Sequence, residues 1–84
     1  MTQIAKLYAW ILANPRASIS FRDFQRLIEA FGFVLDRTTG SHHLYKHEAV
    51  PFPVSVQPRG KDAKSYQISQ FVAICAKYQL SLDR

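Results

Sequence analysis

Apolar residues in the first part of the chain recur at every third or fourth position. They are Ile4, Leu7, Tyr8, Ile11 and Leu12. This spacing is that of one face of an amphipathic helix, so the sequence predicts a helix over residues 2–13. Asn14 and Pro15 come next, and proline ends a helix because it lacks a backbone N–H and clashes with the preceding turn.

A second helical stripe begins after Ser20. Its apolar members are Phe21, Phe24, Leu27, Ile28 and Phe31. Ser20 is a favourable N-cap, and Asp23 lies in the first turn, where the helix dipole favours an anion. Glycine is common just after a helix, so we expect this helix to end at Gly32.

After Gly32 the pattern changes to short β-prone runs. Residues 33–35 form one run, residues 38–41 have turn chemistry, and residues 42–47 form a second run, which together predict a hairpin. Residues 48–53 contain two prolines and are expected to form a loop or a sheet edge. Residues 54–57 alternate apolar and polar positions and predict a third strand.

The C-terminal part starts with a polar, basic stretch, residues 58–64, and returns to helical spacing from Ser65. The apolar residues of this last helix are Ile68, Phe71, Val72, Cys75 and Tyr78. The predicted order is therefore helix, helix, three strands, helix. Strands bracketed by helices indicate an α+β domain, with a three-stranded antiparallel sheet packed by helices on one face and free on the other.

Composition limits the kind of protein this can be. The chain has 84 residues, a formal net charge of +5 and one cysteine, Cys75. A chain this short buries only roughly 60–65% of its unfolded surface, so we expect a single domain with a shallow site for a large or extended ligand. The longest uncharged apolar run, residues 7–13, is far below the ~20 residues of a membrane span. A lone cysteine favours a reducing compartment, so we expect a cytoplasmic protein without membrane contact.

Positive charge is concentrated between residues 37 and 64. The basic residues there are Arg37, Lys46, Arg59, Lys61 and Lys64, against the acidic residues Glu48 and Asp62. The net charge of this segment is therefore +3 (five minus two) of the total +5. Such side chains can hold phosphates of a nucleic acid, although an ordinary solvated rim gives the same pattern.

All three histidines lie in or next to the predicted second strand, at positions 42, 43 and 47. On a strand His43 and His47 share a face about 13 Å apart and His42 points to the other face, so the three cannot hold one metal ion. An imidazole titrates near neutral pH and can move the proton of a ribose 2′-OH in metal-free RNA cleavage. Structural or phosphate-contacting histidines remain the alternative. Ser41 beside His42 does not form a hydrolase pair, because adjacent strand residues diverge.

Two segments together resemble a known family. Residues 39–47, Thr-Gly-Ser-His-His-Leu-Tyr-Lys-His, and residues 63–71, which contain Lys64, Tyr66, Gln67, Gln70 and Phe71, are similar to the HicA family of toxin-antitoxin mRNA interferases. The second segment is similar to a longer HicA-like subgroup that has an extra N-terminal helix. The resemblance covers nearly the whole chain.

The resemblance implies a fold like that of double-stranded-RNA-binding domains, in a single domain over residues 1–84. Residues 1–15 are then the additional helix and residues 20–80 the core. It also implies a small endoribonuclease that cleaves mRNA, needs no metal or small-molecule cofactor, and is neutralised by a HicB-like antitoxin. The catalytic histidine of the family falls on His42, with His43 as the alternative, because a double histidine can be aligned in two ways.

The other residues expected to contact RNA are Gly40, Ser41, Lys46, Arg59, Lys61 and Lys64. Many shorter members have a Pro-x-His element after the third strand, and this chain has Gln57, Pro58 and Arg59 there. The second acid or base of the reaction is thus not identified. The competing hypothesis is a non-catalytic RNA-binding or antitoxin-binding module of the same fold. A DNA-binding regulator is disfavoured, because no predicted helix pair resembles a helix-turn-helix.

Overall fold

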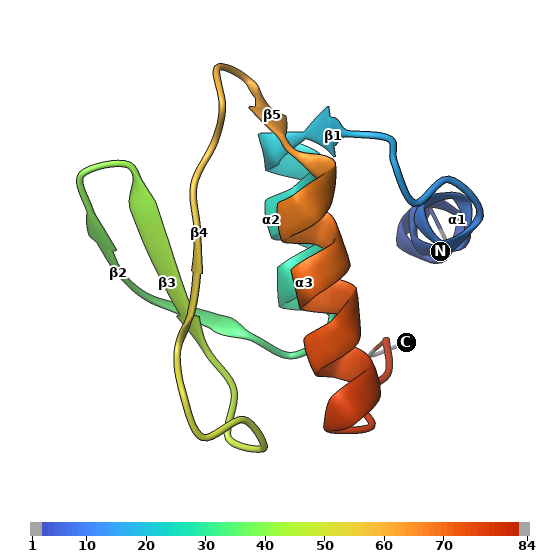
Figure 1. The fold of residues 1–84 in the computed structure, drawn as a ribbon. Helices are drawn as coiled ribbons and strands as arrows, with labels where there is room; N and C mark the ends of the chain where they lie inside the picture. Colours follow the sequence, from blue (N-terminus) through green and yellow to red (C-terminus); the bar gives the residue numbers. More distant parts are fainter. Residues whose placement is uncertain (1–2, 83–84) are drawn as a thin grey trace.

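Three helices and a three-stranded antiparallel sheet make up the main part of the fold, which the computed structural model describes for residues 3–82 (Figure 1). The elements are α1 (Gln3–Ala13), β1 (Ile19–Ser20), α2 (Phe21–Ala30), β2 (Val34–Thr39), β3 (His42–Lys46), β4 (Val54–Val56), β5 (Asp62–Ala63) and α3 (Ser65–Lys77). The predicted α+β class is confirmed, and the order α2-β2-β3-β4-α3 is the one the family resemblance implies. Thr2, predicted to start the first helix, lies outside the described residues.

The start of α2 follows the chemistry of its N-terminus. The Ser20 hydroxyl accepts a hydrogen bond from the backbone N–H of Asp23 at 3.1 Å, which satisfies one of the free donors of the first turn. Asp23 lies in that turn, where its charge complements the helix dipole. The helix ends at Ala30, and Gly32 follows with a φ of 95°, a conformation that side chains rarely adopt. The predicted N-cap is therefore confirmed.

The β2-β3 hairpin is tighter than the sequence predicted. Thr38 and Thr39, assigned above to a turn, are the last two residues of β2, and Thr39 pairs directly with His42. Only Gly40 and Ser41 form the loop. Gly40 has a φ of 60°, as the first loop residue of a type II′ turn requires. Threonine has a high strand propensity, and this explains why Thr38 and Thr39 belong to β2 and not to the turn.

A second, very small sheet was not predicted at all. β1 pairs with β5 in antiparallel register, with Ile19 opposite Ala63 and Ser20 opposite Asp62. The backbone N–H of Phe21 donates to the Lys61 carbonyl at 2.8 Å and extends this contact. The polar, basic stretch of residues 58–64 therefore includes a two-residue strand, Asp62–Ala63, held against the start of α2.

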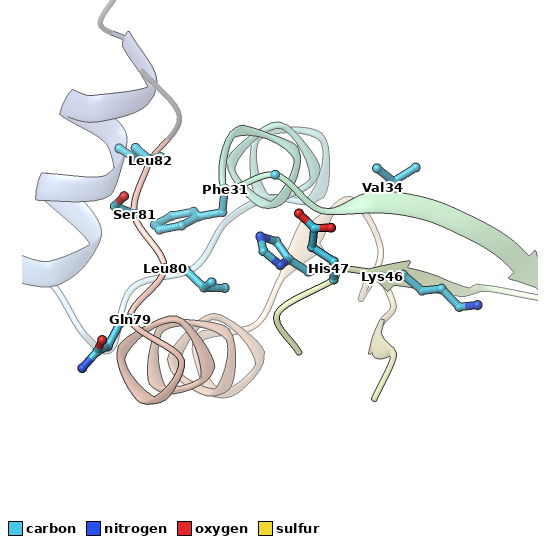
Figure 2. Close-up of a pocket in the computed structure, with 10 residues that line it drawn as sticks. Phe31, Val34, Lys46, His47, Gln79, Leu80, Ser81 and Leu82 are labelled. Carbon is cyan, nitrogen blue, oxygen red and sulfur yellow. The ribbon is translucent and has the colours of Figure 1, made fainter. Parts of the chain in front are cut away.

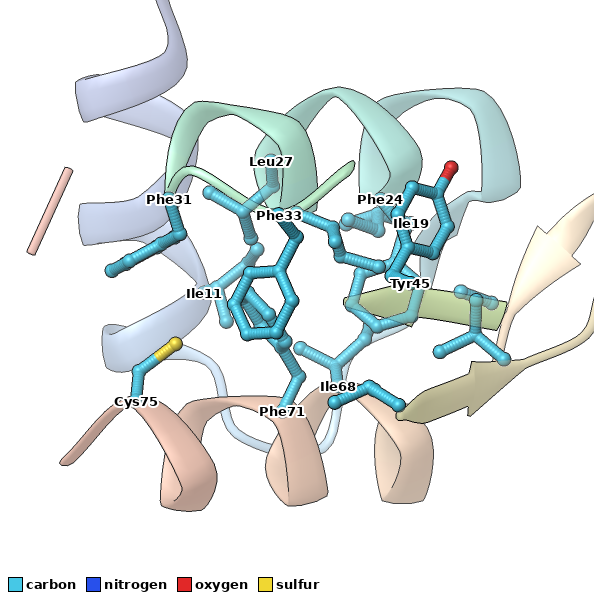
Figure 3. Close-up of a cluster of buried hydrophobic side chains, with 14 of the residues drawn as sticks. Ile11, Ile19, Phe24, Leu27, Phe31, Phe33, Tyr45, Ile68, Phe71 and Cys75 are labelled. Carbon is cyan, nitrogen blue, oxygen red and sulfur yellow. The ribbon is translucent and has the colours of Figure 1, made fainter. Parts of the chain in front are cut away.

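The core lies between the sheet and the two central helices (Figure 3). Phe71 of α3 stands at its centre, with ring centroids 5.8 Å from Phe24, 5.4 Å from Phe31 and 5.5 Å from Phe33. Each fully buried side chain of this size contributes roughly 1.5–3 kcal/mol relative to exposure. Cys75 is buried in the same core, as its place on the helical stripe predicted.

α1 forms a third layer on the side of the helices away from the sheet (Figure 1). Its Tyr8 packs edge to face on Phe31 of α2 at 5.1 Å, and its Ile11 is buried. The sheet thus has α2 and α3 on one face, while its other face is left uncovered by the part of the chain described. None of the described helices has the length and apolar character to cross a lipid bilayer.

Candidate active site

β3 presents alternate side chains to the two faces of the sheet. Tyr45 is fully buried beneath the helices, and Val54 and Val56 of β4 are buried beside it. Since side chains alternate along a strand, His42 and Lys46 lie on the uncovered side. We call this side the open face. From the strand register it consists of His42, Leu44 and Lys46 with their cross-strand neighbours Thr39, Arg37, Val34 and Ser55.

His42 is exposed on the open face at the start of β3. Its Nδ1 lies 3.4 Å from the Ser55 hydroxyl oxygen on β4, within reach of a hydrogen bond. Thr39 stands opposite His42 on the other neighbouring strand. The other ring nitrogen, Nε2, has no hydrogen-bond partner within residues 3–82. His42 is therefore oriented through one nitrogen, and the other is free for a ligand on the open face.

His43 points the other way, toward the helices. Its ring packs edge to face on Phe21 at the start of α2, with centroids 5.1 Å apart. Its Nδ1 lies 3.1 Å from the Ser41 carbonyl oxygen; a carbonyl can only accept, so Nδ1 carries the proton of this bond. The two alternatives for the catalytic residue are thus separated by the sheet itself, and only His42 shares a face with Lys46.

His47 has a third and different environment, beyond the far end of β3. Its Nδ1 accepts a hydrogen bond from the backbone N–H of Ala49 at 3.0 Å, which closes the turn after the strand. The ring lies 5.0 Å from the ring of Phe33, and Gly32 leaves the space in which it fits. These contacts give His47 a structural role.

Two cationic side chains accompany His42 on the open face. Lys46 is four residues along β3, about 13 Å at 3.3 Å per residue. Its ammonium lies 3.7 Å from the carboxylate of Asp36, and both side chains are substantially exposed. An exposed pair of this kind contributes only about 0–1 kcal/mol, so a phosphate can compete with Asp36 for Lys46. Arg37 lies between Lys46 and His42, opposite Leu44.

The other cations come from residues 58–64, which we call the basic loop. β4 runs antiparallel to β3 with Val56 opposite His43, so the chain leaves β4 at the level of His42. The loop then folds on itself. The backbone N–H of Arg59 donates to the backbone carbonyl of Asp62 at 2.7 Å, and the backbone N–H of Asp62 donates to that of Arg59 at 3.1 Å. Arg59, Lys61 and Lys64 are all exposed. The unpredicted β1-β5 pairing is what holds this loop against the start of α2.

The structure thus brings together some of the candidate RNA-contacting residues and separates others. Gly40 and Ser41 form the turn directly before His42, and the basic loop starts beside it, whereas Lys46 lies at the opposite end of β3. Ser55 was missed in the sequence. The one available sign was its position as a polar residue between two apolar ones in a predicted strand, which puts it on the uncovered face.

The surface around His42 is not a deep pocket, as expected for so short a chain. An open groove of about 810 Å³ lies near the other end of the sheet (Figure 2). Phe31, Leu80 and Leu82 line it together with Lys46 and His47. His42 does not line this groove, whereas Val34 and Lys46 of the open face do. Within the described residues, no three His, Cys, Asp or Glu side chains are grouped so that they could hold a metal ion.

Two further groups that could do chemistry are held inert by burial. Burial raises the pKa of the Tyr45 phenol, although the Gln25 amide, which donates to its oxygen at 3.1 Å, acts in the opposite direction. Burial raises the pKa of the Cys75 thiol from 9.0 to about 12. A phenol and a thiol of this kind stay protonated near neutral pH, so neither supplies an acid or base to the open face.

Fold and site together define a small basic α+β protein with one histidine and several cations beside an uncovered sheet face. The family model described as the HicA toxin of bacterial toxin-antitoxin systems matches residues 21–77, from the start of α2 to the end of α3. This is well over half of the chain, which therefore belongs to the HicA toxin family. α1 lies outside the matched region and is the expected additional helix. No curated protein and no solved structure gives a significant match.

Proposed function

We propose that this toxin is a metal-independent endoribonuclease that cleaves mRNA across the open face, with His42 as general acid or base. The observation that carries the proposal is the position of His42. It is the histidine of the family-like Gly-Ser-His segment, it is exposed on the open face, and it lies at the level at which the chain leaves β4 for the basic loop. Membership of the HicA toxin family supports the same activity.

In the proposed reaction the RNA supplies its own nucleophile. His42 Nε2 takes the proton of a ribose 2′-OH while the O2′ forms a bond to the adjacent phosphorus. The bond between phosphorus and the 5′ oxygen breaks, and that oxygen takes a proton from the imidazolium of His42 or from water. The products are a 2′,3′-cyclic phosphate and a 5′-hydroxyl end. Because the nucleophile is a ribose hydroxyl, the step does not need a metal-activated water.

The cations have a separate task in this proposal. Arg59, Lys61 and Lys64 of the basic loop hold the phosphates nearest His42, and Lys46 holds one further along β3. Gly40 and Ser41 bring the backbone of the turn close to the RNA. Charge that develops on the phosphate during the attack is stabilised by the nearest of these groups. The histidine thus moves protons, and the cations provide affinity.

Family membership and the positive net charge of the chain both support a proposal for its protein partner. A toxin of a toxin-antitoxin system has a protein partner, and we propose a HicB-like antitoxin that covers the open face and so blocks access to His42. A net charge of +5 favours an antitoxin whose contact surface is acidic. We further propose that residues 20–80 form the core of a single domain in the cytoplasm and that residues 1–15 add to it.

Induced expression in a bacterial host tests this function. The wild type should arrest growth and degrade total mRNA, the His42→Ala variant should do neither at matched protein level, and co-expressed antitoxin should restore growth to the wild type. If the wild type leaves growth and mRNA intact, the proposed cleavage is wrong. The protein is then a non-catalytic module that binds RNA or antitoxin.

A further inference from the structure

Gln67 of α3 is a buried polar side chain, only 7% exposed, on a helix whose other buried residues are apolar. Its amide makes two hydrogen bonds to the backbone of one residue, Gln57. The Gln67 side-chain Nε2–H donates to the Gln57 backbone carbonyl at 2.6 Å, and the Gln57 backbone N–H donates to the Gln67 side-chain oxygen Oε1 at 2.9 Å. The side chain thus occupies the place that a neighbouring strand would take.

Gln57 lies between the last residue of β4, Val56, and the first residue of the basic loop, Pro58. The register of β3 and β4 puts it at the level of His42. Pro58 comes next and has no backbone N–H, so it cannot continue a strand ladder. The far end of the basic loop is fixed separately, by the β1-β5 pairing and by the bond from Phe21 to Lys61. The bonds from Gln67 therefore fix the near end, next to the histidine.

We infer that Gln67 is a positioning residue of the RNA site, which holds the exit of β4 so that Arg59 and Lys61 stand beside His42. This inference rests on the proposed function for its effect on RNA, and on the two hydrogen bonds for its effect on the loop. A side-chain amide is suited to the task because it offers one donor and one acceptor in a single plane. A carboxylate at this position accepts from the Gln57 N–H and repels its carbonyl, and a methionine does neither.

Backbone amide exchange and NMR chemical shifts test the structural half of the inference. In Gln67→Met we expect the Gln57 amide to lose its protection and the signals of Arg59 and Lys61 to shift, while the core signals of α2 stay in place. Gln70→Met, an exposed glutamine one turn further along α3, is the matched control and should change none of these. If Gln67→Met leaves the loop signals unchanged, Gln67 does not position the loop. Gln67→Glu, which keeps one of the two bonds, serves if the methionine variant does not fold.

A double-mutant cycle tests the functional half. Affinity is measured for an oligoribonucleotide made uncleavable by 2′-O-methylation. Arg59→Ala should weaken binding about 5-fold in the wild-type background and less than about 2-fold in Gln67→Met, because Arg59 is then no longer held at the RNA. Equal effects in the two backgrounds would overturn the inference. If the wild type binds no RNA, the proposed function fails, and the exchange measurement alone decides whether Gln67 orders the loop.

Discussion

His42 and His43 are adjacent in the chain and lie on opposite faces of β3. The ring of His42 approaches Ser55 on the open face, and the ring of His43 packs on Phe21 beneath α2. A shift of one residue along a strand exchanges its two faces, so the two histidines have different neighbours and different access to a ligand. An RNA lying on the open face meets His42 only. Of these two histidines we propose that His42 alone reacts with RNA, whereas the ring of His43 packs on Phe21 in the structure.

The contact between Ser55 and His42 predicts a role for the serine in the rate of cleavage. Ser55→Ala removes the hydroxyl that contacts His42 Nδ1 and with it one restraint on the imidazole ring. A hydrogen bond of this type contributes about 0.5–1.5 kcal/mol, so we expect cleavage to slow by about 2- to 10-fold with RNA affinity unchanged. Single-turnover rates and affinities for the same oligonucleotide measure the two effects. Ser69→Ala, on the exposed side of α3, is the control, and an equal slowing there counts against this role.

The basic loop predicts a dependence of RNA binding on salt. Arg59→Ala and Lys61→Ala each remove one phosphate contact, so each should weaken binding and reduce the slope of log affinity against log salt by about 0.7 for single-stranded RNA. Binding titrations at four salt concentrations measure the slope. Lys77→Ala removes the same charge from the far end of α3 and should leave the slope as it is in the wild type. Equal slopes in all four proteins would contradict contact with phosphates in this loop.

At Gly32 we expect the addition of a single methyl group, by substitution with alanine, to destabilise the fold. Its φ is 95°, and a Cβ there would lie 3.2 Å from Nε2 of His47. Gly40 also has a positive φ, 60°, but a Cβ there meets no atom within 4 Å. We expect Gly32→Ala to lower the free energy of unfolding by about 1–3 kcal/mol and Gly40→Ala by less. Urea unfolding of both variants compares them, and a larger loss at Gly40 would show that the contact with His47 is unimportant.

Because the thiol of Cys75 is buried, we expect the protein to lose stability in alkaline solution. Burial raises the pKa of the thiol in the folded protein from the ordinary value of 9.0 to about 12, and unfolding removes this burial. Below pH 9 it is protonated in both states, and as the pH rises from 9 toward 12 ionisation favours the unfolded chain. The free energy of unfolding should fall over this range, and less steeply in Cys75→Val. At pH 8 the thiol of the folded protein should not react with a thiol reagent until urea unfolds it. Rapid reaction of the folded protein would show that Cys75 is accessible.

The sequence predicted those parts of the fold that depend on interactions between residues close together in the chain. Ser20 and Asp23 defined the start of α2 because the cap and the dipole act within one turn. The β1-β5 pairing could not be predicted, since two-residue strands have no period and their partners are more than forty positions apart in the numbering. The length of the hairpin was misjudged because threonine is common in both turns and strands.

The candidate site was predicted only in part, because some of its contacts join segments that are distant in the chain. The Gly-Ser-His segment and the basic residues are visible in the sequence, and strand alternation separates His42 from His43. It does not decide which of them faces the helices, because Leu44 and Tyr45 are both apolar. The structure decides it by burying Tyr45, whose hydroxyl meets Gln25 of α2. Ser55 and Gln67 act through contacts between distant segments, which a single sequence does not display.

Cleavage of an RNA oligonucleotide by purified wild type, His42→Ala and His43→Ala, with EDTA present, tests the central claim most directly. General acid-base catalysis contributes about 10²- to 10⁴-fold, so His42→Ala should cleave at least 100-fold more slowly than the wild type while its RNA affinity stays within about 3-fold. His43→Ala, once shown to be folded, should still cleave, and the products should carry 2′,3′-cyclic phosphate ends. Cleavage by His42→Ala at the wild-type rate, or complete dependence of the wild type on a divalent metal, would contradict the account.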